Sequence, residues 1–240
     1  MFEVMIILAL TLMAGMAMPL GALIGCKEHI HPDWLENEFR HSVVAFGGGA
    51  LLSAVALVLV PEGSSYLDMT TVALCFCGGG LTFMALDVLL YKLNTPASQL
   101  AAMLSDFIPE SLALGAALAL GGTGSALLLA ALMVLQNMPE GFNAYRELGA
   151  TSRYTSSRII TMFALMALLG PVAGLSGYVW LADSPTLVAG IMLFAGGGIL
   201  YSVFQDIAPQ AVLEKHWAPP MGAVLGFVLG ILGHMLTTHA

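Results

Sequence analysis

The chain has 240 residues, of which 58% are hydrophobic and only 9% are charged. A soluble domain usually carries about a quarter charged residues, so this composition excludes a soluble protein and indicates one that spans a membrane. The net charge of −8 gives no reason to expect a nucleic-acid partner, and the three cysteines form no even disulfide framework.

Eight apolar runs are each long enough to cross a bilayer, which takes about twenty residues in a helix. They lie at 4–25, 42–61, 69–91, 100–120, 124–145, 158–181, 186–209 and 219–238. Several of the short connections are rich in glycine, serine and proline, which favour turns. The expected fold is therefore an all-α polytopic membrane protein with eight transmembrane helices.

The basic residues divide the connections into two classes. All seven lie in or beside the odd-numbered connections, counted in chain order: Lys27, Arg40, Lys92, Arg146, Arg153, Arg158 and Lys215. Cytoplasmic loops carry the excess of Lys and Arg. Both termini are therefore expected to lie outside.

The two ends of the chain resemble each other. Residues 45–63 and 194–211 both contain a triple glycine, an apolar stretch and a proline near the end. The pattern indicates an inverted repeat, typical of secondary transporters, with a first repeat over 1–95, two central helices over 96–150 and a second repeat over 151–240. The alternative is that glycine-rich packing surfaces look alike by chance.

The two central runs carry polar residues around a proline, in the segments "DFIPES" and "QNMPEG". Asp106 and Glu110 are four residues apart, as are Gln136 and Glu140. Four residues are about one helical turn, so each pair shares a helix face. The polar side chains are therefore expected to face one site between the two helices.

An ionised acid at the centre of a bilayer costs at least about 2.5–3.5 kcal/mol on insertion scales, and three grouped acids also repel one another. A divalent cation bound by carboxylate and amide oxygens relieves both costs. Each proline also frees a backbone carbonyl, that of Ser105 or Leu135, as a further oxygen donor. The alternatives are acids that stay protonated within the bundle, or a proton relay.

These two motifs resemble the paired H-N-x-P-E-G and H/Q-D-x-P-E-G motifs of the Zrt/Irt-like (ZIP) divalent-metal transporters, and the chain is similar to a divergent bacterial member. The resemblance implies a 3+2+3 inverted repeat in a bacterial inner membrane, with periplasmic termini. It also implies movement of zinc, iron, manganese, cadmium or a similar ion toward the cytoplasm. The first metal site of the family falls on Asp106, Glu110, Gln136 and Glu140, with Asp106 in place of the usual histidine.

The adjoining second site of the family uses positions that hold Phe107, Asn137 and Gly170 in this chain. Phe107 and Gly170 offer no side-chain ligand, so a single metal site is expected, with Asn137 as an auxiliary candidate. The donors of that site are all oxygens. This set favours harder ions such as Mn²⁺ or Fe²⁺ without excluding zinc.

Two further groups of residues are weaker candidates. Gln205 and Asp206 stand where the family often has His-Glu, and Asp206 is either an auxiliary ligand or proton acceptor, or a residue in water near the cytoplasmic end. His29, His31 and Asp33 in the first connection either relay released metal or belong to an ordinary solvated loop.

The expected function is transport of a divalent cation toward the cytoplasm through one intramembrane carboxylate site. The metal is the substrate, no organic cofactor is expected, and the partners are the ion and the lipid bilayer, with a homodimer left open. The alternatives are a divalent-cation-selective channel or a proton-coupled transporter of another solute. An enzyme is not expected, because the chain has no H-E-x-x-H motif and no G-x-S-x-G motif with a plausible partner.

Overall fold

A computed structural model describes residues 2–27, 33–93, 96–120, 122–152, 154–181, 183–212 and 217–238. These residues form helices joined by short turns, and no strand occurs among them. The helices are α1 (Phe2–Lys27), α2 (Asp33–Ala54), α3 (Val60–Ser64), α4 (Met69–Leu93), α5 (Pro96–Ala119), α6 (Thr123–Thr151), α7 (Ser156–Ala167), α8 (Leu169–Leu181), α9 (Pro185–Ser202), α10 (Ala208–Gln210) and α11 (Ala218–Thr238). Two π-helical segments, η1 (Val55–Leu59) and η2 (Val203–Ile207), connect α2 to α3 and α9 to α10. The predicted all-α class is confirmed.

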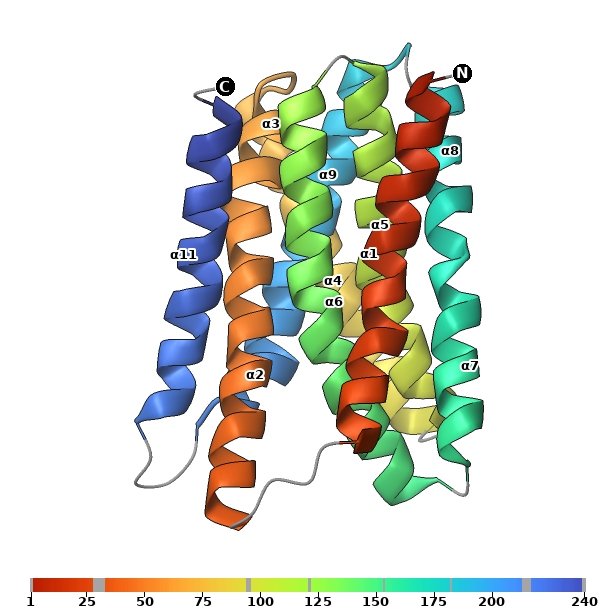
Figure 1. Ribbon diagram of the computed structural model, residues 1–240. Helices are drawn as coiled ribbons and strands as arrows, with labels where there is room; N and C mark the ends of the chain where they lie inside the picture. Colours follow the sequence, from red (N-terminus) through yellow and green to blue (C-terminus); the bar gives the residue numbers. More distant parts are fainter. Residues whose placement is uncertain are drawn as a thin grey trace.

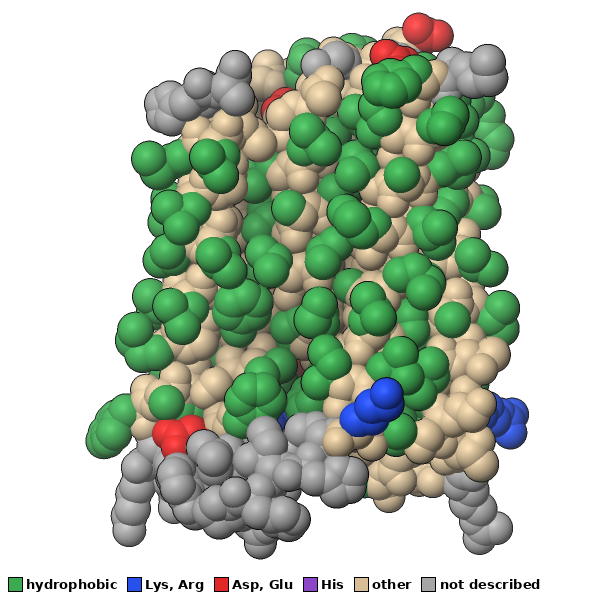
Figure 2. Space-filling model, in the orientation of Figure 1, with side chains coloured by type: hydrophobic (Ala, Val, Ile, Leu, Met, Phe, Trp, Pro, Cys, Tyr) green, Lys and Arg blue, Asp and Glu red, His purple; other side chains and the backbone are tan. Residues whose placement is uncertain are grey.

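Seven stretches of the described chain are long and apolar enough to cross a membrane: 2–27, 37–64, 69–92, 123–151, 156–181, 185–210 and 218–238. Figure 2 shows apolar side chains spread over the middle of the visible face. The protein is therefore an integral membrane protein. The fourth predicted run forms α5, which is absent from the seven. This helix carries two acids, and α1, α6, α8 and α9 pack around it, so it need not be as apolar as a lipid-facing helix.

The helices form one bundle with two distinct ends. Both termini lie at one end, together with α3, and we call this the terminus end (Figure 1). The described basic residues belong to helix segments near the opposite end, the basic end (Figure 1): Lys27, Arg40, Lys92, Arg146 and Arg158. This division follows the predicted split of the connections.

The helices pack in matching pairs. α1 packs along α6 and α5 along α8, while α2 packs along α11 and α4 along α9. Glycines allow these close approaches. A Cβ atom on Gly79 of α4, for example, would lie only 1.9 Å from the carbonyl oxygen of Phe194 on α9. Small residues at such contacts let helix backbones come together in a membrane.

Three local features were not predicted from the sequence. The sixth run is broken at Leu168 into α7 and α8. Each π-helical segment ends just before a proline-containing turn, with Pro61 after η1 and Pro209 after η2. A proline crowds the carbonyl four residues earlier, and that residue lies within the π-helical segment in both cases, so the wider π turn accommodates the ring.

The start of α4 follows from one side chain. Asp68 accepts hydrogen bonds from the backbone N–H groups of Thr70 and Thr71, at 3.0 and 3.2 Å, and from the Thr71 hydroxyl at 2.5 Å. The hydroxyl of Thr71 and these amides hold the pKa of Asp68 below its usual value. The carboxylate thus caps the helix at the membrane surface.

Candidate metal site in a central cavity

A cavity of about 800 Å³ lies between α2, α4, α5, α6 and the η2–α10 segment. Its wall follows α6 from Gln136 to Thr151 and α4 from Phe83 to Tyr91. At 1.5 Å per residue, the α6 part of the wall is roughly 20 Å long. The cavity therefore reaches from the middle of the bundle to the basic end.

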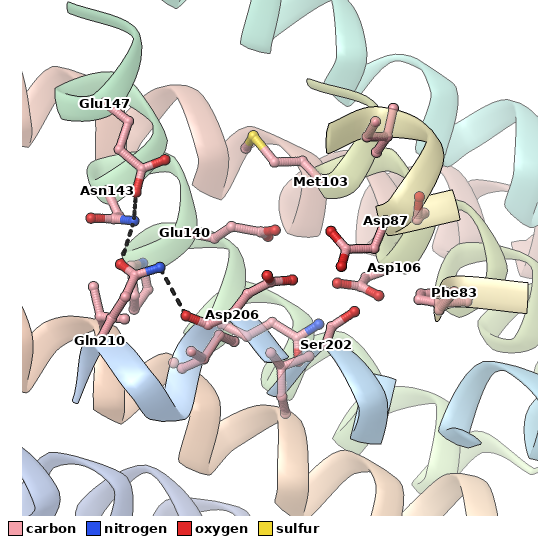
Figure 3. Close-up of a pocket in the computed structure, with 18 of the residues that line it drawn as sticks. Phe83, Asp87, Met103, Asp106, Glu140, Asn143, Glu147, Ser202, Asp206 and Gln210 are labelled. Atoms are coloured by element: carbon pink, nitrogen blue, oxygen red, sulfur yellow. Dashed lines mark hydrogen bonds between the residues drawn. The ribbon is translucent and has the colours of Figure 1, made fainter. Parts of the chain in front are cut away.

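Five carboxylate side chains line this cavity: Asp87 of α4, Asp106 of α5, Glu140 and Glu147 of α6, and Asp206 of η2. Figure 3 shows Asp87, Asp106, Glu140 and Asp206 pointing from separate elements toward the same space. No Lys, Arg or His is found among the described lining residues. The described part of the wall is thus acidic without a compensating cationic side chain, which favours a cationic occupant.

Three of the four predicted metal ligands, Asp106, Gln136 and Glu140, lie on the cavity wall. The fourth, Glu110, is fully buried behind them. Its Oε2 accepts a hydrogen bond of 2.6 Å from Nε2 of Gln136, which joins the two central helices. The structure therefore brings the two polar motifs together. Glu110 does not line the cavity itself but contacts Gln136, which does.

Three oxygen atoms of this group are buried without a hydrogen-bond partner: Oδ1 of Asp106, Oε1 of Glu110 and Oε1 of Gln136. Buried polar atoms are normally satisfied, so three orphaned acceptors at one place call for a positive partner. In the part of the chain that the structure describes, no three His, Cys, Asp or Glu side chains stand close enough to hold a metal ion. Binding would therefore require side-chain rotation toward the ion.

An aromatic ring fills the place where the resemblance in sequence predicts no side-chain ligand for a second metal. Phe107 is fully buried, and a Cβ atom on Gly170 would lie 2.6 Å from the ring's Cζ atom. The same ring atom lies at 2.8 Å from a Cβ placed on Gly15. The amide of Asn137 donates to the carbonyl of Ala14 at 2.9 Å, so this auxiliary candidate faces α1 and not the cavity.

The remaining candidates fall in different places. Asp206 and Ser105 lie on the cavity wall, and the Ser105 hydroxyl donates to the carbonyl of Ala101 at 2.7 Å. Gln205 lines a separate groove of about 410 Å³ formed by residues of α4, α9 and η2. His29 and His31 lie outside the described residues, as does the side chain of Asp33.

The sequence reasoning missed a polar chain along the cavity wall (Figure 3). Asn143 Nδ2 donates to Glu147 at 2.8 Å and to Gln210 at 3.3 Å, and Gln210 Nε2 donates to the carbonyl of Asp206 at 2.9 Å. Asn143 follows Glu140 by three residues and could have been found from helix periodicity. Gln210 gave no such signal, because only packing brings α10 to α6.

Asp87 is tied to a second element. Tyr201 lies in the last turn of α9, and its hydroxyl donates to Oδ2 of Asp87 at 3.1 Å. Asp87 is the only acid in its apolar run, so no local motif marks it in the sequence. Its place opposite Asp106 comes from the packing of α4 against α9.

Comparison with known proteins adds no assignment. No protein-family model matches the chain, and no curated protein matches its sequence. The interpretation of the site therefore depends on its geometry: an acidic cavity with unpartnered oxygens, enclosed by membrane-spanning helices.

Proposed function

We propose that the protein carries divalent metal cations, such as zinc, iron or manganese, across the membrane. The observation that supports this most is the acidic cavity: five carboxylates and no cationic side chain among its described lining, deep in a bundle of apolar helices. An uncompensated group of acids in a membrane marks an ion or proton pathway.

Of the predicted ligands, Asp106 and Glu140 are the carboxylates that meet the ion in the cavity, because both lie on its wall. Gln136 also lines the wall, and it is hydrogen-bonded to Glu110, which lies behind it. In this proposal the arriving cation replaces the Gln136 amide as the positive partner of Glu110, and the freed Gln136 carbonyl oxygen joins the ligands. The resulting site is all oxygen, which favours harder divalent ions.

The helix packing supports the 3+2+3 inverted repeat, because α1–α6 and α2–α11 contacts have counterparts in α8–α5 and α9–α4. The cavity also supports a carrier over an open channel. Its described lining does not extend along α6 beyond Gln136 toward the terminus end, and Leu59, Leu114 and Leu132 are buried between the helices on that side. If the basic end is cytoplasmic, the cavity receives the ion on its way inward.

Uptake of Mn²⁺, Fe²⁺, Zn²⁺, Cd²⁺ and Mg²⁺ into proteoliposomes tests the proposal, with each ion also used as a competitor. Glu110→Gln and Glu140→Gln keep the side-chain shape but remove a charge, so each should lower saturable uptake at least tenfold. Asp183→Asn, an exposed acid in the turn before α9, is the matched control and should transport normally. Normal uptake of every ion by both glutamate variants would overturn the proposal.

A further inference from the structure

The close contacts between helices occur in equivalent pairs, and the residue numbers of equivalent positions differ by a constant amount. This constant difference assigns each residue of one helix a counterpart in the equivalent helix. Phe46 and Gly49 of α2 correspond to Phe194 and Gly197 of α9, and Phe76 and Gly79 of α4 correspond to Ala223 and Gly226 of α11. In each case the glycine of one helix faces a backbone carbonyl of its neighbour: Gly79 faces Phe194, Gly197 faces Phe76, Gly226 faces Phe46 and Gly49 faces Ala223. A Cβ atom on any of the four would lie within 2.1 Å of that carbonyl oxygen.

A second set of contacts follows the same rule. Met18 and Gly21 of α1 correspond to Gly174 and Gly177 of α8, and Leu112 and Gly115 of α5 correspond to Met138 and Gly141 of α6. The facing pairs are Gly21 with Met138, Gly141 with Met18, Gly177 with Leu112 and Gly115 with Gly174. The sequence spacing is the same within each pair of helices, so every residue of the cavity wall on these helices has a defined counterpart.

Residues equivalent to those at the cavity mouth lie together in a pocket at the terminus end. A small pocket of about 70 Å³ is lined there by Glu62, Ala117, Gly122 and Met192, among others. At the spacings given by the glycine contacts, these four residues correspond to four residues that line the large cavity: Gln210, Asn143, Leu148 and Val44. The small pocket therefore occupies the position equivalent to the cavity mouth, at the other end of the bundle.

A hydrogen bond closes this second position. The Ser125 hydroxyl, in the first turn of α6, donates to Oε1 of Glu62 at 2.5 Å. Glu62 directly follows Pro61 and the π-helical segment η1, as Gln210 follows Pro209 and η2. The backbone there has already left regular α geometry, so a small rotation of α3 can separate it from α6.

We propose that the pocket at Glu62 is the closed outer mouth of the pathway, and that the Glu62–Ser125 pair is the clasp that keeps it closed. When the clasp opens, the Glu62 carboxylate is freed in a pocket lined by apolar side chains such as Val188 and Met192, where it can attract a divalent cation from solution. The name of the cargo rests on the proposed function, whereas the mouth and its clasp do not.

Thiol labelling tests the clasp without any metal. Cys26, Cys75 and Cys77 are replaced by serine, Ala117→Cys is introduced, and a membrane-impermeant maleimide is added from the terminus side of proteoliposomes. A tag at the carboxyl end reports that side. Ser125→Ala should raise the labelling rate at least fivefold. Ser125→Thr keeps the hydroxyl and Glu62→Gln keeps an acceptor oxygen, so both should label at the parent rate.

Glu62→Ala removes the acceptor and should reproduce the effect of Ser125→Ala, which also covers the case in which one variant does not fold. Unchanged labelling in whichever clasp-breaking variant folds, or faster labelling of Ala117→Cys from the basic side, would overturn the inference. If the parent protein takes up no metal, the proposed function is refuted, but the labelling result still tests the clasp.

Discussion

Phe107 occupies a position where the resemblance to the ZIP family predicts a second metal site, and its side chain offers no ligand. Its ring fills the space beside Gly170, which offers no ligand either. The sequence could predict the missing ligands, because residue types are read directly. It could not predict that one of the two residues fills the space left by the other, since they are far apart in the chain and meet only through the packing of α5 on α8.

Gly170→Ala should destabilise the protein. The added methyl group would lie 2.6 Å from the Phe107 ring and 2.9 Å from the carbonyl oxygen of Thr11. Overpacking of this kind costs about 1–3 kcal/mol, so the midpoint of thermal unfolding in detergent should fall by several degrees. Gly149→Ala, with no atom within 4 Å of the new methyl group, is the control and should not lower it.

Phe107→Leu in the Gly170→Ala background should recover part of the loss, because the Thr11 carbonyl remains in the way. If the double variant has a midpoint of thermal unfolding no higher than that of Gly170→Ala alone, a clash with the Phe107 ring is not the cause of the destabilisation.

At the scale of the helices, composition and periodicity carried most of the prediction. Each of the eight apolar runs corresponds to a helix or a pair of helices, because about twenty apolar residues have no other stable form in a bilayer. The π-helical segments and the break at Leu168 could not be predicted in this way. They depend on where prolines and close backbone contacts force the helix to adjust, which is decided by neighbours distant in sequence.

The contact between α4 and α9 gives a sharp test of close packing, because two neighbouring glycines have opposite surroundings. Gly79→Ala would place a methyl group 1.9 Å from a backbone oxygen of Phe194, which cannot turn aside as a side chain can. The helices must separate, so the midpoint of thermal unfolding should fall sharply. Gly78 has no atom within 4 Å of an added Cβ, and alanine is the better helix former by about 1 kcal/mol.

Gly78→Ala should therefore unfold at the parent temperature or above it. Equal decreases in the unfolding midpoint of Gly78→Ala and Gly79→Ala would mean that the close approach of α9 is not the reason why Gly79 must be glycine.

At the scale of the whole molecule, only part of the candidate site could be predicted from the sequence. Asp106, Gln136 and Glu140 could be placed together because helix spacing and a repeated motif point to them. Glu147 and Asn143 were missed, and Asp206 was only a weaker candidate. The cavity joins residues of α4, α5, α6 and η2, and their convergence is a property of the bundle that no local pattern contains.

The direction in which the cavity opens can be tested through the positive-inside rule. The described basic residues lie at the end that the cavity reaches, so that end should face the cytoplasm. In the background without native cysteines, Thr151→Cys at the cavity mouth should resist an impermeant maleimide in intact cells and react in inside-out vesicles. Asp183→Cys, at the terminus end, should behave in the opposite way. The reverse pattern would place the acidic cavity on the outer face, and the proposed direction of transport would then be wrong.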